Sequence, residues 1–334
     1  MSVANVWIES GRICYKISKI DTIYNNLYFN SNLYKDVSAD ILSKNNKNNK
    51  NNKDKTKWFL ELRSTTIELI NTSELLDFVD LMNEHVNVIL HFTFNSIDLN
   101  ILFGRLYNVK SLVLISDTTV NYDRTINIFP EKLENLEIKF EIGHEKLLNL
   151  PSTLKNLSLL DNYDDPLPIL PASLQSLTLG ENFDQPLDNL PTLLEELYLK
   201  GSFNKPLDNL PYNLKILVVN SELFDHNVDN LPYGLQVLKL GHNFTKPLNN
   251  LPPTIKELSL LTCVMPNKNR TLNTLPDSIE YLTLNIAYEK IDKMPKNLKV
   301  LNYIASDRHD YKIISKLEKA YPNIEFSELN YEFY

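Results

Sequence analysis

Residues 171–190 read Pro171-Ala-Ser-Leu174-Gln-Ser-Leu177-Thr-Leu179-Gly-Glu-Asn-Phe183-Asp-Gln-Pro186-Leu187-Asp-Asn189-Leu190. The next twenty residues repeat the pattern, from Pro191-Thr-Leu-Leu194-Glu-Glu-Leu197-Tyr-Leu199 to Phe203-Asn-Lys-Pro206-Leu207-Asp-Asn209-Leu210. Similar units, most of them twenty or twenty-one residues long, begin at Pro130, Pro151, Pro171, Pro191, Pro211, Pro232, Pro252, Pro276 and Pro295. A fixed period of this length indicates a solenoid, in which each unit buries its apolar side only by stacking on its neighbours.

Each unit begins with a proline, which apolar residues follow after three, six and eight positions, as Leu174, Leu177 and Leu179 follow Pro171. The last two apolar positions are separated by one residue, which is the period of a β-strand. We therefore expect a short strand whose leucines point inward and which pairs with its neighbours at about 4.8 Å in a parallel sheet. The fixed φ of proline suits a tight turn before this strand.

The second half of each unit carries one aromatic residue, usually followed by a proline. The aromatic residues are Tyr163, Phe183, Phe203, Phe224 and Phe244. This half is too short and too rich in proline for an α-helix, so we expect turns or 3₁₀ segments on the side opposite the sheet. The aromatic residues should stack there into a spine.

One asparagine recurs two residues before the next proline, at Asn149, Asn189, Asn209, Asn230 and Asn250. We interpret it as a buried ladder, in which each side-chain amide satisfies backbone groups of a turn. The alternative is that asparagine occurs here only because it is a good turn residue.

The ends of the chain follow other patterns. Residues 1–57 contain a predicted hairpin over 5–17 and an Asn/Lys-rich flexible loop over 44–57. Residues 58–107 read as longer β–α units, with strands from Trp58 and over 86–92 and helices over 73–84 and 97–106. The repeat solenoid should run over 108–304, and residues 305–334 should close it with a helix over 309–320 and a strand over 323–327. Terminal units of a solenoid are atypical because they shield its open core.

The repeated pattern resembles the FNIP repeat family, a short variant of the leucine-rich repeat that is typical of amoebae and of the large viruses that infect them. The best local match is Phe203-Asn204-Lys205-Pro206, and the resemblance covers roughly residues 126–304. It implies a leucine-rich-repeat-like solenoid that binds proteins, with no catalytic residues. Some members carry an F-box before the repeats, which implies an alternative role as a substrate adaptor of a cullin-type ubiquitin ligase.

The composition argues against several classes of partner. Lys and Arg total 34 against 42 Asp and Glu, and the net charge of −8 disfavours binding to nucleic acid. No stretch reaches the roughly eighteen apolar residues of a membrane span, and no signal peptide is visible. We therefore expect a cytoplasmic protein, in the host cytoplasm if the protein is viral, in which Cys14 and Cys263 are free thiols.

Motifs for catalysis, metal binding or phosphate binding are missing from the sequence. Cys263 and His242 lie about one repeat apart and could form a catalytic pair, but no third group accompanies them. We expect a non-enzymatic protein without a cofactor or a small-molecule substrate.

The outward positions of the strands form the candidate binding surface. They place an apolar centre at Tyr198, Ile216, Val218 and Val237. Charged residues flank this centre at Glu196, Lys200, Lys239 and Glu257. An apolar centre with a polar rim is the anatomy of a protein–protein interface. The alternative is that β-branched residues occur there because they favour strands.

Overall fold

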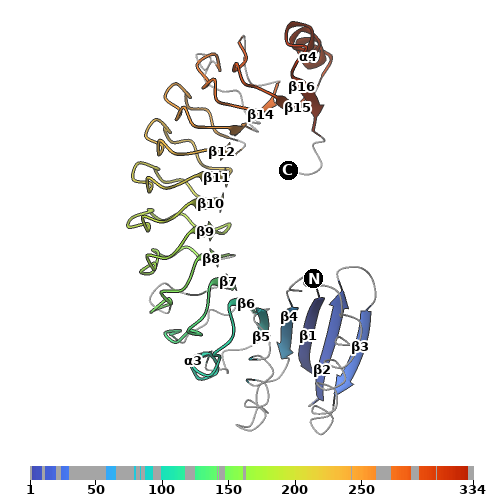
Figure 1. Cartoon of the computed structure of the whole chain (residues 1–334), viewed down its shortest axis with the longest axis vertical. Coiled ribbons are helices and arrows are strands. Elements are labelled where there is room, and N and C mark those ends of the chain that lie inside the picture. The colour runs from blue at the N-terminus through green and yellow to red at the C-terminus, as the bar shows by residue number, and fades with distance from the viewer. Residues whose placement is uncertain are drawn as a thin grey trace, which may run out of the picture. The chain divides into compact units, whose positions relative to one another are not determined.

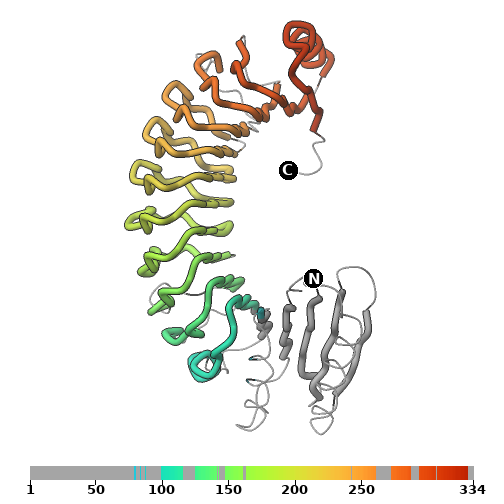
Figure 2. Tube along the Cα trace, viewed as in Figure 1, coloured from blue at the N-terminus to red at the C-terminus, as the bar shows by residue number. Residues whose placement is uncertain are grey.

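The protein is described by a computed structural model of the 334-residue chain (Figures 1 and 2). It describes residues 2–9, 12–19, 24–29, 58–64, 79, 83, 87–92, 99–116, 125–140, 142, 147–160, 163–241, 243–260, 272–286, 293–305 and 307–329, those of 2–64, 88–92 and 116 by their backbone only. The chain forms two compact units, Met1–Leu157 and Ser158–Tyr334. The loop predicted over 44–57 and nearly all of the helix predicted over 73–84 lie outside the described residues.

The second unit is a stack of coils, each contributing one short strand to a parallel sheet (Figure 1). Its strands are β9 (Ser176–Leu179), β10 (Glu196–Gly201), β11 (Ile216–Ser221), β12 (Val237–Leu240), β13 (Glu257–Leu260), β14 (Tyr281–Asn285), β15 (Val300–Ile304) and β16 (Glu325–Glu328). Each pairs in parallel with the next strand of the chain. Strand β8 (Asn156–Leu159) spans the division between the two units. The predicted leucine-rich-repeat-like solenoid is confirmed.

The register places equivalent leucines of successive coils side by side. Leu177 pairs with Leu197, Leu197 with Leu217, and Leu217 with Leu238. All four side chains are fully buried, and residues on either side of them in the strands are half-buried. The alternation follows because successive side chains of a strand point to opposite faces. Each repeat of about twenty residues therefore forms one coil, and equivalent residues of successive coils lie next to one another.

The predicted tight turn before each strand is also confirmed. The backbone N–H of the residue three positions after the proline donates to the proline carbonyl, as from Leu174 to Pro171 (3.1 Å) and from Leu214 to Pro211 (3.1 Å). The described return segments between Leu159 and Tyr281 contain turns and irregular backbone but no helix. Proline suits this position because the turn requires its carbonyl and makes no use of an N–H.

The aromatic residues of the return segments form the predicted spine. Tyr163, Phe183, Phe203, Phe224 and Phe244 are buried, and each ring stacks on the next with centroids 6.1–6.2 Å apart. The Tyr163 hydroxyl donates to the carbonyl of Pro166 (2.7 Å), and burial raises the pKa of Tyr163 well above its ordinary value. Each coil therefore contributes to two buried stacks that run along the solenoid, one of leucines and one of aromatic rings.

The buried asparagine ladder was a wrong prediction. All five asparagines are exposed, and Asn149 and Asn189 adopt positive φ angles of 54° and 60°. Asparagine tolerates this left-handed conformation better than most residues, so Asn149 and Asn189 shape their turns in this way, whereas Asn209, Asn230 and Asn250 have no positive φ. The alternative explanation from the sequence holds.

Hydrogen bonds between coils are made instead by three aspartates that directly follow aromatic rings, Asp164, Asp184 and Asp225. The carboxylate of Asp164 accepts the N–H of Asp184 (2.8 Å), and that of Asp184 accepts the N–H of Asn204 (2.7 Å). Asp225 likewise accepts the N–H of Thr245 (2.6 Å) and pairs with Lys246. Each side chain thus satisfies a backbone group of the next coil.

The first unit has its own strands, β1 (Ser2–Glu9), β2 (Arg12–Lys19), β3 (Tyr24–Phe29), β4 (Trp58–Ser64), β5 (Asn87–Phe92), β6 (Ser111–Ser116) and β7 (Asn135–Lys139), and the helix α3 (Leu99–Phe103). Strands β1 and β2 form the predicted hairpin, and β2 pairs with β3, also antiparallel. Strands β4 to β7 pair in parallel in chain order, and β4 also pairs with β1. Here buried Asn83 bridges coils by accepting the N–H of Tyr107 (2.9 Å).

The predicted closing helix and strand are α4 (Arg308–Ala320) and β16. A capping box begins α4, in which Asp307 accepts the N–H of Asp310 and the Asp310 carboxylate accepts the N–H of Asp307. Ile314 is buried, and the Tyr311 hydroxyl donates to Glu328 on β16 (2.5 Å). The last coil is thereby joined to the helix.

Candidate protein-binding surface

The eight residues predicted to form a binding surface lie together on the outward face of β10 to β13. Glu196, Ile216, Val237 and Glu257 occupy paired positions on consecutive strands. Tyr198, Val218 and Lys239 form a second row, two residues further along. Lys200 pairs in register with Asn220 on β11. All eight predicted side chains are half-buried, so their outward sides reach solvent.

Polar contacts hold the rim of this surface. Lys239 and Glu257 form an ion pair with an N–O distance of 2.6 Å between β12 and β13. The Tyr198 hydroxyl donates to Glu196 (3.3 Å), and the pKa of Tyr198 is raised, first by burial and then by the Glu196 charge. The aliphatic side chains of Ile216, Val218 and Val237 therefore lie between Glu196 on one side and the Lys239–Glu257 ion pair on the other.

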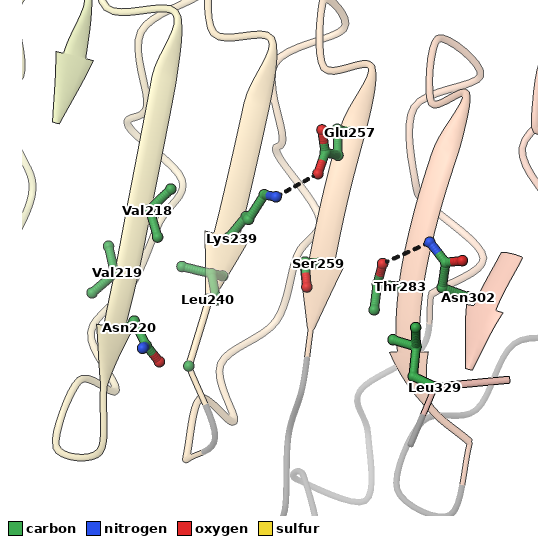
Figure 3. A pocket seen from close by; sticks show the side chains of 11 residues that line it. Val218, Val219, Asn220, Lys239, Leu240, Glu257, Ser259, Thr283, Asn302 and Leu329 are labelled. Carbon is green, nitrogen blue, oxygen red and sulfur yellow. Dashed lines mark hydrogen bonds and ion pairs between the residues drawn. The ribbon is translucent and has the colours of Figure 1, made fainter. Parts of the chain in front are cut away.

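A hollow of about 330 Å³ opens beside this apolar centre (Figure 3). Its lining is Val218, Val219, Asn220, Lys239, Leu240, Gly241, Glu257, Ser259, Thr283, Asn302 and Leu329. Val218, Lys239 and Glu257 are thus shared with the predicted surface. The Asn302 side chain donates to the Thr283 hydroxyl on the neighbouring strand (3.4 Å).

Small residues on adjacent coils create the hollow. Gly241 lies close to the preceding coil, and a Cβ there would come within 2.5 Å of the Ser221 carbonyl oxygen. Ser259 and Thr283 supply short outward side chains on the next two strands. The sequence prediction missed Asn220, Ser259, Thr283, Asn302 and Leu329. A run of short side chains at one outward position of consecutive repeats was the available signal.

A second exposed apolar area lies where the chain turns into the strands. Tyr212 and Tyr233, which follow the prolines of adjacent coils, are 71% and 73% exposed, and Leu193 is 52% exposed. No sequence pattern pointed to these residues. They offer a matched comparison for the sheet face, because they are aromatic or aliphatic and are not among the residues that line the hollow.

Metal-binding or catalytic constellations are sparse in the described part of the chain. Asp307, His309 and Asp310 have ligand atoms within 4.8 Å of one another. Asp307 accepts the N–H groups of His309 (2.7 Å) and Asp310 (3.0 Å), so the cluster is explained as a helix cap. Cys263 and His242, the considered catalytic pair, lie outside the described residues. Among the helices described, none has the length and hydrophobicity to span a bilayer.

Comparison with protein families supports the repeat assignment made from the sequence. Residues 163–202 match the FNIP repeat. This FNIP match covers the coils of Tyr163 and Phe183 and reaches the end of β10, so the predicted resemblance is confirmed. No curated protein matches the chain.

Among solved structures, the chain is similar to one described as the crystal structure of CroV588, a novel circular LRR protein structure. The TM-score is 0.43 and the sequence identity is 20%. The aligned part covers 74% of this chain and 46% of that chain, so it spans less than half of the CroV588 protein.

Proposed function

We propose that this FNIP-repeat solenoid is a non-enzymatic scaffold that binds a protein partner on the sheet face of β10 to β13. Solenoids present extended surfaces of this kind because each coil adds one more row of outward side chains. The expected partner is a protein rather than a nucleic acid, since the chain carries a net charge of −8. The cytoplasmic location stays a prediction that imaging of the tagged protein tests.

One observation supports the proposal most strongly. Tyr198, Ile216, Val218 and Val237 lie in two adjacent rows on three consecutive strands, beside the Lys239–Glu257 pair and the hollow. A tyrosine among aliphatic side chains, surrounded by polar groups, is typical of the residues that contribute most to protein–protein affinity. The ubiquitin-ligase alternative has no support in the described residues, of which 2–29 form the strands β1 to β3.

Affinity capture with the full chain tests this function. Proteins retained from a cell lysate by the wild type should be lost with the double variant Tyr198→Ala, Val218→Ser. The matched control is Leu193→Ala, Tyr212→Ala, which removes comparable apolar area from the turns before β10 and β11 and should retain the same proteins. Thermal unfolding must show that both variants fold. Loss of capture with the control variant but not with the sheet-face variant would refute the proposed surface.

A further inference from the structure

The hollow beside the apolar centre is lined by polar groups that carry almost no net charge. Lys239 and Glu257 are the charged residues of its lining, and they already pair with each other at 2.6 Å. The other polar groups are the amides of Asn220 and Asn302 and hydroxyl groups such as that of Thr283. A charged group entering the hollow would lose hydration and meet no uncompensated opposite charge, which costs free energy. The chemistry therefore favours an uncharged occupant.

The two amides lie at opposite ends of the hollow. Asn220 is exposed on β11 and Asn302 is half-buried on β15 (Figure 3). These strands are four spacings apart, or roughly 19 Å at about 4.8 Å per spacing, which an extended chain of about six residues spans at about 3.3 Å per residue. An asparagine side chain has both a donor and an acceptor, so it can donate to the C=O of a peptide group and accept from its N–H.

Between the two amides, the floor of the hollow suits an occupant with a short side chain. Ser259 is 8% exposed and lies between Lys239 and Thr283 in the paired row of β12 to β14. Val218 at one end and Leu329 at the other supply apolar contacts. An extended segment could thus place an apolar residue at each end and a small residue over Ser259.

We propose that the hollow binds an extended, uncharged peptide segment of about six residues, which lies across β11 to β15 with its backbone hydrogen-bonded to Asn220 and Asn302. The inference rests on the proposed protein-binding function and names the class of segment that the partner presents. The apolar centre at Tyr198 and Ile216 contacts the part of the partner that adjoins this segment.

Selection from a phage-displayed library of random nine-residue peptides on the full chain tests the segment. Selected peptides should lack Asp, Glu, Lys and Arg in their shared stretch. In fluorescence anisotropy, the dissociation constant of a selected peptide should rise by a factor of at least about five with Asn220→Ala, Asn302→Ala, since this variant loses two hydrogen bonds to the peptide. Thr283→Phe, which fills the hollow, should weaken binding as well. Gln236→Ala, an exposed change outside the lining, should leave it unchanged.

Three results would overturn the inference. The first is a charged residue that the selected peptides share at one position. The second is equal binding of the selected peptide by the wild type and both lining variants. The third is that no selected peptide binds the wild type more tightly than Thr283→Phe. Asn220→Ala alone serves if the double variant fails to fold, because Asn220 is exposed. Partner capture that Tyr198→Ala, Val218→Ser abolishes but Asn220→Ala, Asn302→Ala preserves would refute the peptide segment and leave the proposed function standing. Capture that survives in both would refute the proposed function itself.

Discussion

The rings of Phe183 and Phe203 stack with their centroids 6.2 Å apart and an angle of 3° between their planes. Both side chains are fully buried, and they occupy equivalent positions of adjacent coils. Phe203 also stacks on Phe224, at 6.1 Å. One substitution at Phe203 therefore removes contacts from three coils at once.

Replacing Phe203 tests how much the aromatic spine stabilises the solenoid. Phe203→Ala should lower the free energy of unfolding by about 3–5 kcal/mol, as truncations of buried Phe do, and Phe203→Leu by less. Urea unfolding followed by circular dichroism measures both. Tyr212→Ala is the control, because Tyr212 is 71% exposed and its loss should change stability by no more than about 0.5 kcal/mol. Equal effects at the two positions would argue against a stabilising spine.

The aspartates that join neighbouring coils give a second prediction. Asp184 accepts the N–H of Asn204 (2.7 Å) and pairs with Lys205 (2.6 Å), so Asp184→Ala should destabilise the protein by about 1–2 kcal/mol. Asp188→Ala, an exposed change in the same coil, should be nearly neutral. Asn209→Leu should also leave the melting temperature nearly unchanged, because Asn209 is exposed. A large loss of stability with Asn209→Leu would restore the asparagine ladder.

Two glycines allow a paired test of backbone strain. Gly201 has a φ of +56°, and a Cβ there would lie 2.2 Å from the Glu181 carbonyl oxygen. Gly201→Ala should cost more than about 1 kcal/mol, because the left-handed conformation alone costs that much for other residues. Gly234→Ala is the control, since its Cβ would lie 3.6 Å from the Tyr212 carbonyl oxygen. Comparable melting temperatures for the two variants would contradict the geometry of the Gly201 turn.

Glu134 gives a prediction about pH in the first unit. Hydrogen bonds from Lys110 and then Lys155 lower the pKa of Glu134 from 4.5 to about 2. Because the folded-state pKa is lowered, the stabilisation is present above pH 4.5 and is lost as the pH falls toward 2. The difference in melting temperature between wild type and Glu134→Gln should therefore shrink over this window. A difference that stays constant from pH 7 to pH 2.5 would show that the charge of Glu134 has no such role.

Much of the core could be predicted from the sequence, because the same local pattern recurs at a fixed distance along the chain. Leu177, Leu197 and Leu217 were expected to pair once each repeat formed one coil, since a register shift of one residue would expose a row of leucines to water. The same reasoning placed Phe183 and Phe203 in one stack. The predicted domain boundaries near 57, 107 and 304 stay predictions.

Polar positions were harder to predict, because a repeated polar residue can satisfy either its own turn or the next coil. Asn189 shapes its own turn through a positive φ, whereas Asp184 accepts a hydrogen bond from the following coil. Both residues recur at fixed positions of the repeat, so periodicity does not separate the two roles. Only the positions of the backbone N–H groups in space distinguish them.

The sequence by itself determined the coil, its length and the rows of buried leucines and aromatic residues. The reason is that apolar residues recur at a fixed period along the chain, and their burial drives the coils to stack. It also placed Tyr198, Ile216, Val218 and Val237 on neighbouring outward positions. Only the tertiary structure decided the hollow, which depends on the close approach of Gly241 to Ser221 and on Leu329, far along the chain. The physical reason is that a cavity is set by the sizes of side chains from several coils at once, and no single repeat contains that information.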